Sequence, residues 1–110
     1  MTPVEDALVF AIEPLVPEVA PDVYEGDATE FCTYNYTPFP RLHADGRPQV
    51  IVYLVQVHYC APRGQACARK LVNLKNALFN AGFTYPTVEN ASDRDGQHYV
   101  LECQYKDDDV

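Results

Sequence analysis

The chain lacks the sequence features by which common enzyme classes and membrane proteins are recognised. It contains no GxSxG, HExxH, GxxxxGK[ST] or GxGxxG motif, so the nucleophile elbow, the zinc-protease helix and both common phosphate-binding loops are missing. The longest uninterrupted apolar run covers only residues 50–55, far fewer than a membrane span needs. No basic segment followed by an apolar one opens the chain, which favours a cytosolic start. We expect no enzymatic activity and no membrane association.

Basic residues are also scarce. Eight Lys and Arg face 16 Asp and Glu, which gives a formal net charge of -8. An acidic surface repels DNA phosphates, so nucleic-acid binding through a basic patch is disfavoured. The basic residues gather in the middle third and the acidic ones toward the two ends. This asymmetry indicates either simple solubility or a charged contact surface in an assembly.

The four cysteines form no CxxC pair, which disfavours a zinc knuckle or a thioredoxin-type redox site. We expect reduced and mostly buried thiols. His58 and Cys60, two apart on one strand, resemble a base beside a nucleophile, but a reactive thiol needs a helix N-terminus or a positive, open site. Convergence of Cys32, Cys60 and Cys103 on His58 would make a metal site. Core packing of the cysteines is the stronger expectation, so we predict no catalytic residue, metal or cofactor.

Residues 49–60 predict the central strand of the fold. They are rich in β-branched and aromatic residues, and side chains of a strand alternate between two faces. One of these faces is entirely apolar; its residues are Ile51, Tyr53, Val55, Val57 and Tyr59. We expect an antiparallel sheet with helices packed on this apolar face.

Two helices are predicted, one on either side of this strand. The first begins at Pro3 and ends near Ile12 or Glu13, because Pro14 and Pro17 follow. The second covers residues 65–80 and ends at Gly82. Its apolar stripe steps by four, three and four residues through Cys67, Leu71, Leu74 and Leu78.

Further strands are predicted at residues 29–37, 84–90 and 97–106, with a turn at 93–96 and a short extended piece near 22–24. The whole chain, 1–110, forms a single domain. The predicted fold class is α+β: a mostly antiparallel sheet of four to five strands with two helices packed on one face, in the order α-β-β-α-β-β.

Residues 38–48 are predicted to form a long loop, because they contain three prolines and an Asp45-Gly46 turn signal. Long stiffened loops often carry contacts, and a loop packed on itself is a nearly equal expectation. Residues 107–110 form a short acidic tail. The candidate contact residues in these two segments are Phe39, Arg41, Leu42, His43, Arg47, Asp107, Asp108 and Asp109.

Taken in order, these segments resemble one known family over residues 4–106. An N-terminal helix and a Pro-rich stretch lead to the aromatic strand Phe31-Cys32-Thr33-Tyr34-Asn35-Tyr36. A long strand at 50–59, a helix at 70–83 and a closing hairpin that ends with residues 97–105 follow. This order and spacing resemble the tail-terminator and tail-to-head joining proteins, the tail completion proteins of long-tailed bacteriophages.

The resemblance implies a virion structural protein that assembles as a homo-oligomer, a hexameric ring at the head-proximal end of the tail. Its partners would be the tail tube protein and the head connector, and DNA would pass through the lumen without specific binding. The subunit would reside in the host cytoplasm during assembly and then in the virion. Two alternatives stay open: a small cytosolic α+β binding or regulatory module, and a thiol- or metal-dependent enzyme that uses His58, Cys60 and Cys103.

Overall fold

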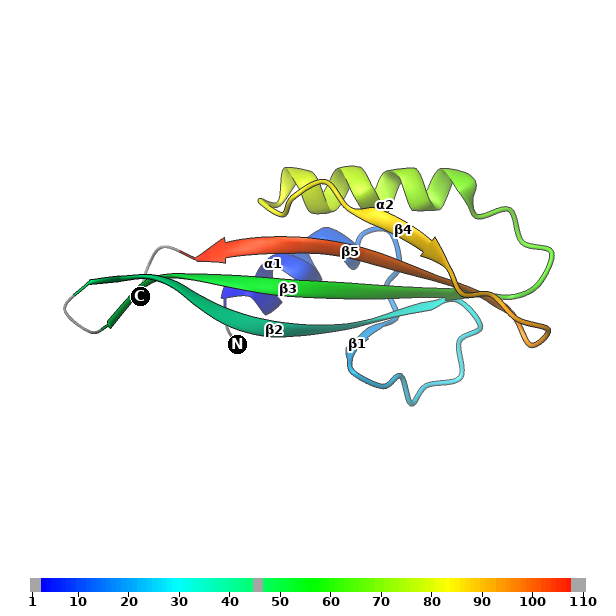
Figure 1. The fold of residues 1–110 in the computed structure, drawn as a ribbon. Coiled ribbons are helices and arrows are strands. Elements are labelled where there is room, and N and C mark those ends of the chain that lie inside the picture. Colours follow the sequence, from blue (N-terminus) through cyan, green and yellow to red (C-terminus); the bar gives the residue numbers. More distant parts are fainter. Residues whose placement is uncertain (1–2, 45–46, 108–110) are drawn as a thin grey trace.

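The computed structural model describes residues 3–44 and 47–107, and within residues 40–49 it describes the backbone alone. The fold is α+β, as predicted, with two helices and a five-stranded sheet (Figure 1). The elements in chain order are α1 (Pro3–Ile12), β1 (Val19–Pro21), β2 (Phe31–Ala44), β3 (Arg47–Ala61), α2 (Ala68–Asn80), β4 (Thr87–Asn90) and β5 (Gln97–Asp107).

The sheet has the strand order β1-β2-β3-β5-β4, so β3 is its central strand, as the sequence predicted. β1 runs parallel to β2, and the other three pairings are antiparallel. The short extended piece expected near residues 22–24 lies slightly earlier, as β1. β4 is an edge strand, which agrees with the position of Pro86 just before it.

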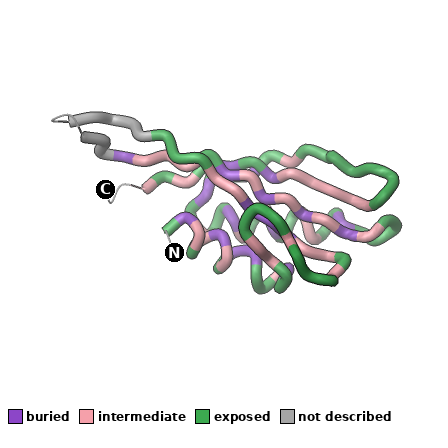
Figure 2. Tube along the Cα trace, turned by 90° about the horizontal axis from the view of Figure 1, so that it is seen from below, coloured by how far each residue is buried: buried purple, intermediate pink, exposed green. Residues whose placement is uncertain are grey.

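Both helices pack on one face of the sheet and form a single core. The helices contribute residues such as Leu8, Ile12, Leu74 and Leu78, all fully buried. The sheet contributes buried residues from alternate positions of its strands: Cys32, Tyr34, Val55, Val57, Tyr59, Leu101 and Cys103. Buried segments, purple in Figure 2, alternate with less buried ones along the chain. The predicted packing of helices on the apolar face of β3 is confirmed.

The ends of both helices follow local chemistry. α1 ends at Ile12, two residues before Pro14. α2 begins at Ala68, three residues later than predicted. Beyond its end Gly82 adopts a φ of 104°, and the Phe83 N–H donates to the Leu78 carbonyl at 3.1 Å. A residue without a Cβ accepts this left-handed conformation at no steric cost, so Gly82 ends the helix as expected.

The predicted long loop at residues 38–48 is wrong. β2 continues to Ala44 and β3 begins at Arg47, so the two strands form one long hairpin. The predicted turn at Asp45-Gly46 lies outside the described residues. Three prolines indicated a loop because proline cannot donate to a ladder. Two of them, Pro38 and Pro40, lie instead on the edge side of β2, where a missing donor is tolerated.

Candidate functional site: the ribbon and the open sheet face

The far end of the β2–β3 hairpin is supported by no third strand among the described residues. β5 reaches β3 only as far as the pair Ile51 and Asp107. Beyond that point β2 and β3 pair with each other alone, from Arg41 opposite Val50 to Ala44 opposite Arg47. We call residues 41–44 and 47–50 the ribbon. In Figure 1 it continues past the end of β5, along the 54 Å long axis of a molecule only 25 and 24 Å across.

The structure places the predicted contact residues at or beside this ribbon. The backbones of Arg41, Leu42, His43 and Arg47 form part of it; their side chains are not described. Phe39 lies at its base and is 47% exposed. Asp107 ends β5 opposite Ile51, while Asp108 and Asp109 lie outside the described residues. The two segments singled out from sequence, 38–48 and the start of the tail, therefore meet at one end of the sheet.

The outer edge of β2 is poorly suited to the addition of another strand. Cys32 N–H donates to the Glu18 carbonyl and the Tyr34 carbonyl accepts from Asp22, so even-numbered residues of β2 direct their backbone groups away from β3. β1 covers this edge only as far as Tyr34. Pro38 and Pro40 have the same orientation and carry no N–H, which removes two donors from the uncovered edge. Prolines at such positions prevent unwanted strand pairing.

The second face of the sheet, which neither helix covers, is the other candidate contact surface; we call it the open face. It carries odd-numbered residues of β2 and even-numbered residues of β3 and β5. Leu54 is 41% exposed there. A shallow hollow of about 750 Å³ lies over this face; its lining includes Asn35, Thr37, Leu54, Gln56, Tyr85 and Glu102. At the opposite end from the ribbon, Tyr24 stacks on Phe31 with ring centroids 4.4 Å apart.

A pair of histidines also lies on the open face. His58 Nδ1 and His98 Nε2 are 2.8 Å apart, and the Asn35 amide nitrogen is 3.5 Å from His58 Nε2. Burial, and then the nearby His98, lower the pKa of His58. Cys60 occupies the position directly opposite His98. Sequence reasoning singled out His58 and Cys60 but missed His98, because only the register between β3 and β5 brings it close.

The cysteines do not gather around His58. Cys32 and Cys103 lie on the helix-covered face, whereas His58 and Cys60 lie on the open face. All four thiols are free, and three are buried, as predicted. Burial raises the pKa of Cys32 and of Cys103 to about 12, and it also raises the pKa of Cys60. A thiol with a raised pKa is a poor nucleophile at neutral pH.

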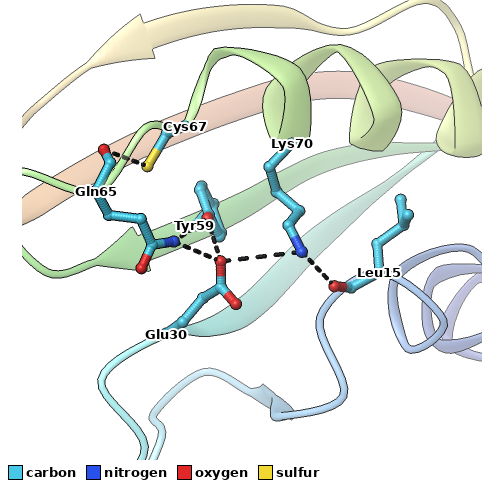
Figure 3. A network of polar contacts seen from close by, with 6 residues as sticks. All are labelled: Leu15, Glu30, Tyr59, Gln65, Cys67 and Lys70. Atoms are coloured by element: carbon cyan, nitrogen blue, oxygen red, sulfur yellow. Dashed lines mark hydrogen bonds and ion pairs between the residues drawn. The ribbon is translucent and has the colours of Figure 1, made fainter.

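A polar network not foreseen from the sequence ties the start of α2 to the sheet (Figure 3). The Tyr59 hydroxyl and the Gln65 amide both donate to Glu30 Oε2. Lys70 Nζ donates to the Leu15 carbonyl at 2.7 Å and lies 3.9 Å from the same carboxylate oxygen. Burial, and then the hydrogen bond to Glu30, raise the pKa of Tyr59. Since each of these groups has a partner within the chain, the network serves the fold.

No protein-family model and no curated protein matches the chain. Among residues 3–44 and 47–107, no helix is long and apolar enough to cross a membrane. The geometry alone defines the candidate site, which consists of the ribbon, the adjoining end of β5 and the open face.

Proposed function

We propose that this protein is a tail-terminator or tail-to-head joining subunit, which forms a ring at the head-proximal end of a bacteriophage tail tube. The observation that carries the proposal is the ribbon. An isolated two-stranded hairpin is only marginally stable in water. Among the described residues, three pairs of this hairpin lie beyond the last contact of β3 with β5: Arg41 with Val50, His43 with Pro48 and Ala44 with Arg47. Such an arm gains stability when a second surface packs against it, and a neighbouring subunit or the tail tube supplies that surface.

The order of elements also supports the proposal. The resemblance implies a helix, an aromatic strand, a long strand, a second helix and a closing hairpin, and α1, β2, β3, α2 and the β4–β5 pair follow one another in this order. The single difference is the three-residue strand β1. This agreement concerns the fold, and it leaves the ring as our inference.

The chain carries two segments of opposite charge that would suit the contacts of a closed ring. Cyclic rings form when one face of a subunit meets a different face of the next. Arg41 and Arg47 lie in the ribbon segment, whereas residues 107–109 are all acidic. Opposite charges on different segments favour such heterologous contacts and steer association. Because Pro38 and Pro40 remove two donors from the uncovered edge of β2, we infer that the edge at the base of the ribbon is not used for strand addition.

The net charge of -8 fits passage of DNA through a ring. An acidic lumen repels phosphates, so DNA moves through it without binding. The subunit then acts through contacts alone, in the virion after assembly and in the host cytoplasm before it.

The test is a chain with a shortened ribbon. Residues 42–49 are replaced by Asn-Gly, a pair suited to a tight hairpin turn, which retains the hydrogen-bonded pair Arg41 and Val50. Removal of residues 41–47 alone would leave residues 48–50 without partners. In a phage that carries this gene in place of its own copy, we expect a folded subunit, full heads and unjoined tails in electron micrographs. Substitution of Arg41 and Arg47 by Lys is the matched control and should preserve joining.

Normal numbers of joined particles with the shortened chain would contradict the proposal. So would a gene that lies far from genes for capsid, connector and tail tube proteins. In that case the alternative, a small α+β binding or regulatory module, predicts a monomer or dimer in sedimentation at every concentration.

A further inference from the structure

His58 and His98 come from neighbouring strands and meet on the open face. His58 lies opposite Val100 and His98 opposite Cys60, so the two histidines are diagonal neighbours across β3 and β5. Their ring centroids are 5.0 Å apart with planes inclined by 33°, and the nearest ring nitrogens are 2.8 Å apart. Both residues are half-buried, and His98 lines a 530 Å³ hollow that continues toward Asp93 and Asp95.

The surroundings of His58 allow Nδ1 to be the nitrogen that binds a metal ion. The Asn35 side chain lies beside Nε2, on the opposite side of the ring from His98. In the free chain the Asn35 amide nitrogen faces Nε2 and donates to it, so Nδ1 carries the ring proton and donates it to His98 Nε2. A turn of the Asn35 amide by half a rotation brings its oxygen to Nε2, which then keeps the ring proton and leaves a lone pair on Nδ1. A hydrogen bond to the remote nitrogen is the usual way in which proteins orient a metal-binding histidine.

We propose that His58 Nδ1 and His98 Nε2 form a two-histidine binding site for a divalent transition-metal ion, with water in its remaining positions. Metal–imidazole bonds of about 2.0–2.1 Å place two nitrogens about 2.9 Å apart at a right angle and about 3.3 Å apart at a tetrahedral angle. The observed 2.8 Å matches the right angle. This geometry is typical of nickel and copper sites.

The ion would lie on the solvent side of the line between the two nitrogens. In the free pair one nitrogen donates its proton to the other. Upon metal binding His58 keeps its proton on Nε2 instead of Nδ1, so both facing nitrogens turn lone pairs toward the ion. Both rings have to turn out of the line of the hydrogen bond, and no helix covers the open face above the pair. The bound ion would link β3 to β5.

The site has only two protein ligands. Among the described residues, no group of three or more His, Cys, Asp or Glu side chains is placed to hold one ion. Cys60 lies opposite His98 in the register of β3 and β5 but is not part of such a group. The proposal does not depend on the phage-tail function, and it differs from the sequence prediction of no metal because that prediction could not include the register of β3 and β5.

The experiment is isothermal titration of the full chain with nickel(II) at about pH 7.5, one unit above the usual histidine pKa. We expect one ion per chain. His58→Asn and His98→Asn should each weaken binding at least about tenfold. Two controls should bind as the wild type does: Cys60→Ser, beside the pair, and His43→Asn, which changes the third histidine, in the ribbon.

A second measurement uses the wild-type chain and is independent of how the variants fold. Nickel(II) is paramagnetic, so substoichiometric additions should broaden the imidazole NMR signals of His58 and His98 before those of His43. The proposal is overturned if nickel does not bind. It is equally overturned if His43→Asn abolishes binding, if Cys60→Ser abolishes it, or if the signals of His43 broaden first.

Discussion

The two faces of β3 differ in how far their side chains are buried. Val55, Val57 and Tyr59 point to the helices and are at most 2% exposed, whereas Leu54, one position before Val55, is 41% exposed on the open face. Residues only one position apart therefore lie in a dry core or in contact with water, as the two-residue period of a strand requires. The covered face supplies the folding energy, and the open face and the ribbon are left available for contacts.

The largest expected effect compares one leucine from each environment. Leu74→Ala removes a fully buried side chain of α2 and should lower the free energy of unfolding by about 2–5 kcal/mol. Leu54→Ala on the open face should cost less than about 1 kcal/mol, because part of the side chain already meets water. Urea unfolding of both variants measures the difference. Equal losses would show that the open face belongs to the folding core.

Next in size is the comparison of two tyrosine hydroxyls. Tyr59→Phe removes a hydrogen bond to the Glu30 carboxylate from a fully buried residue, and should cost about 1.5–3 kcal/mol. Tyr85→Phe removes an exposed bond to Asn76 and should change stability by less than about 0.5 kcal/mol. Thermal and urea unfolding should rank the two. A harmless Tyr59→Phe would show that the Glu30 network contributes nothing.

Alkaline pH should lower the stability of the folded chain, because two of its thiols are buried. Cys32 and Cys103 have pKa values of about 12 in the folded chain, whereas unfolded thiols ionise near pH 8.5. Above that pH the unfolded chain loses protons that the folded chain keeps, so stability falls as pH rises toward 12. The loss is at most about 1.4 kcal/mol per pH unit for each thiol. Urea unfolding at about pH 8 and pH 10 should show a smaller loss of stability between the two pH values in Cys32→Ala/Cys103→Ala than in the wild type. An equal loss in both chains would contradict this cause.

The smallest effect on stability is expected at the prolines of the hairpin. Pro38→Thr/Pro40→Thr restores N–H donors on the uncovered edge of β2 and should change the free energy of unfolding by less than about 1 kcal/mol. It should nevertheless promote aggregation, seen as light scattering and thioflavin binding. Pro48→Thr is the control, because its new donor faces His43 within the hairpin. Aggregation of the control alone would show that the backbone nitrogens of residues 38 and 40 do not face the uncovered edge of β2.

Strong local patterns made much of the fold predictable. The alternation along β3, the leucine stripe of α2 and the prolines after α1 each determine an element with little help from distant residues. The ribbon was missed because a proline pattern cannot distinguish a loop from a strand whose N–H groups face an uncovered edge. That distinction depends on the position of β1, whose three residues carry almost no signal of their own.

The candidate site was predictable only in part. Phe39 and Asp107 could be singled out as unburied apolar and acidic residues, but their meeting at one end of the sheet depends on the pairing of β3 with β5. The same register brings His98 to His58, and the path of the chain into α2 brings Lys70 to Glu30. Such contacts between distant residues leave no trace in spacing or composition.

The central claim is that the body of the sheet folds by itself and that the ribbon gains its partner in an assembly. Amide hydrogen exchange, read by mass spectrometry, tests this most directly in the free subunit and in subunits within particles. We predict slow exchange at residues 55–59 in both states, and fast exchange at residues 41–44 and 47–50 in the free subunit that becomes slow in particles. Ribbon amides that exchange at the same rate in both states would contradict the account.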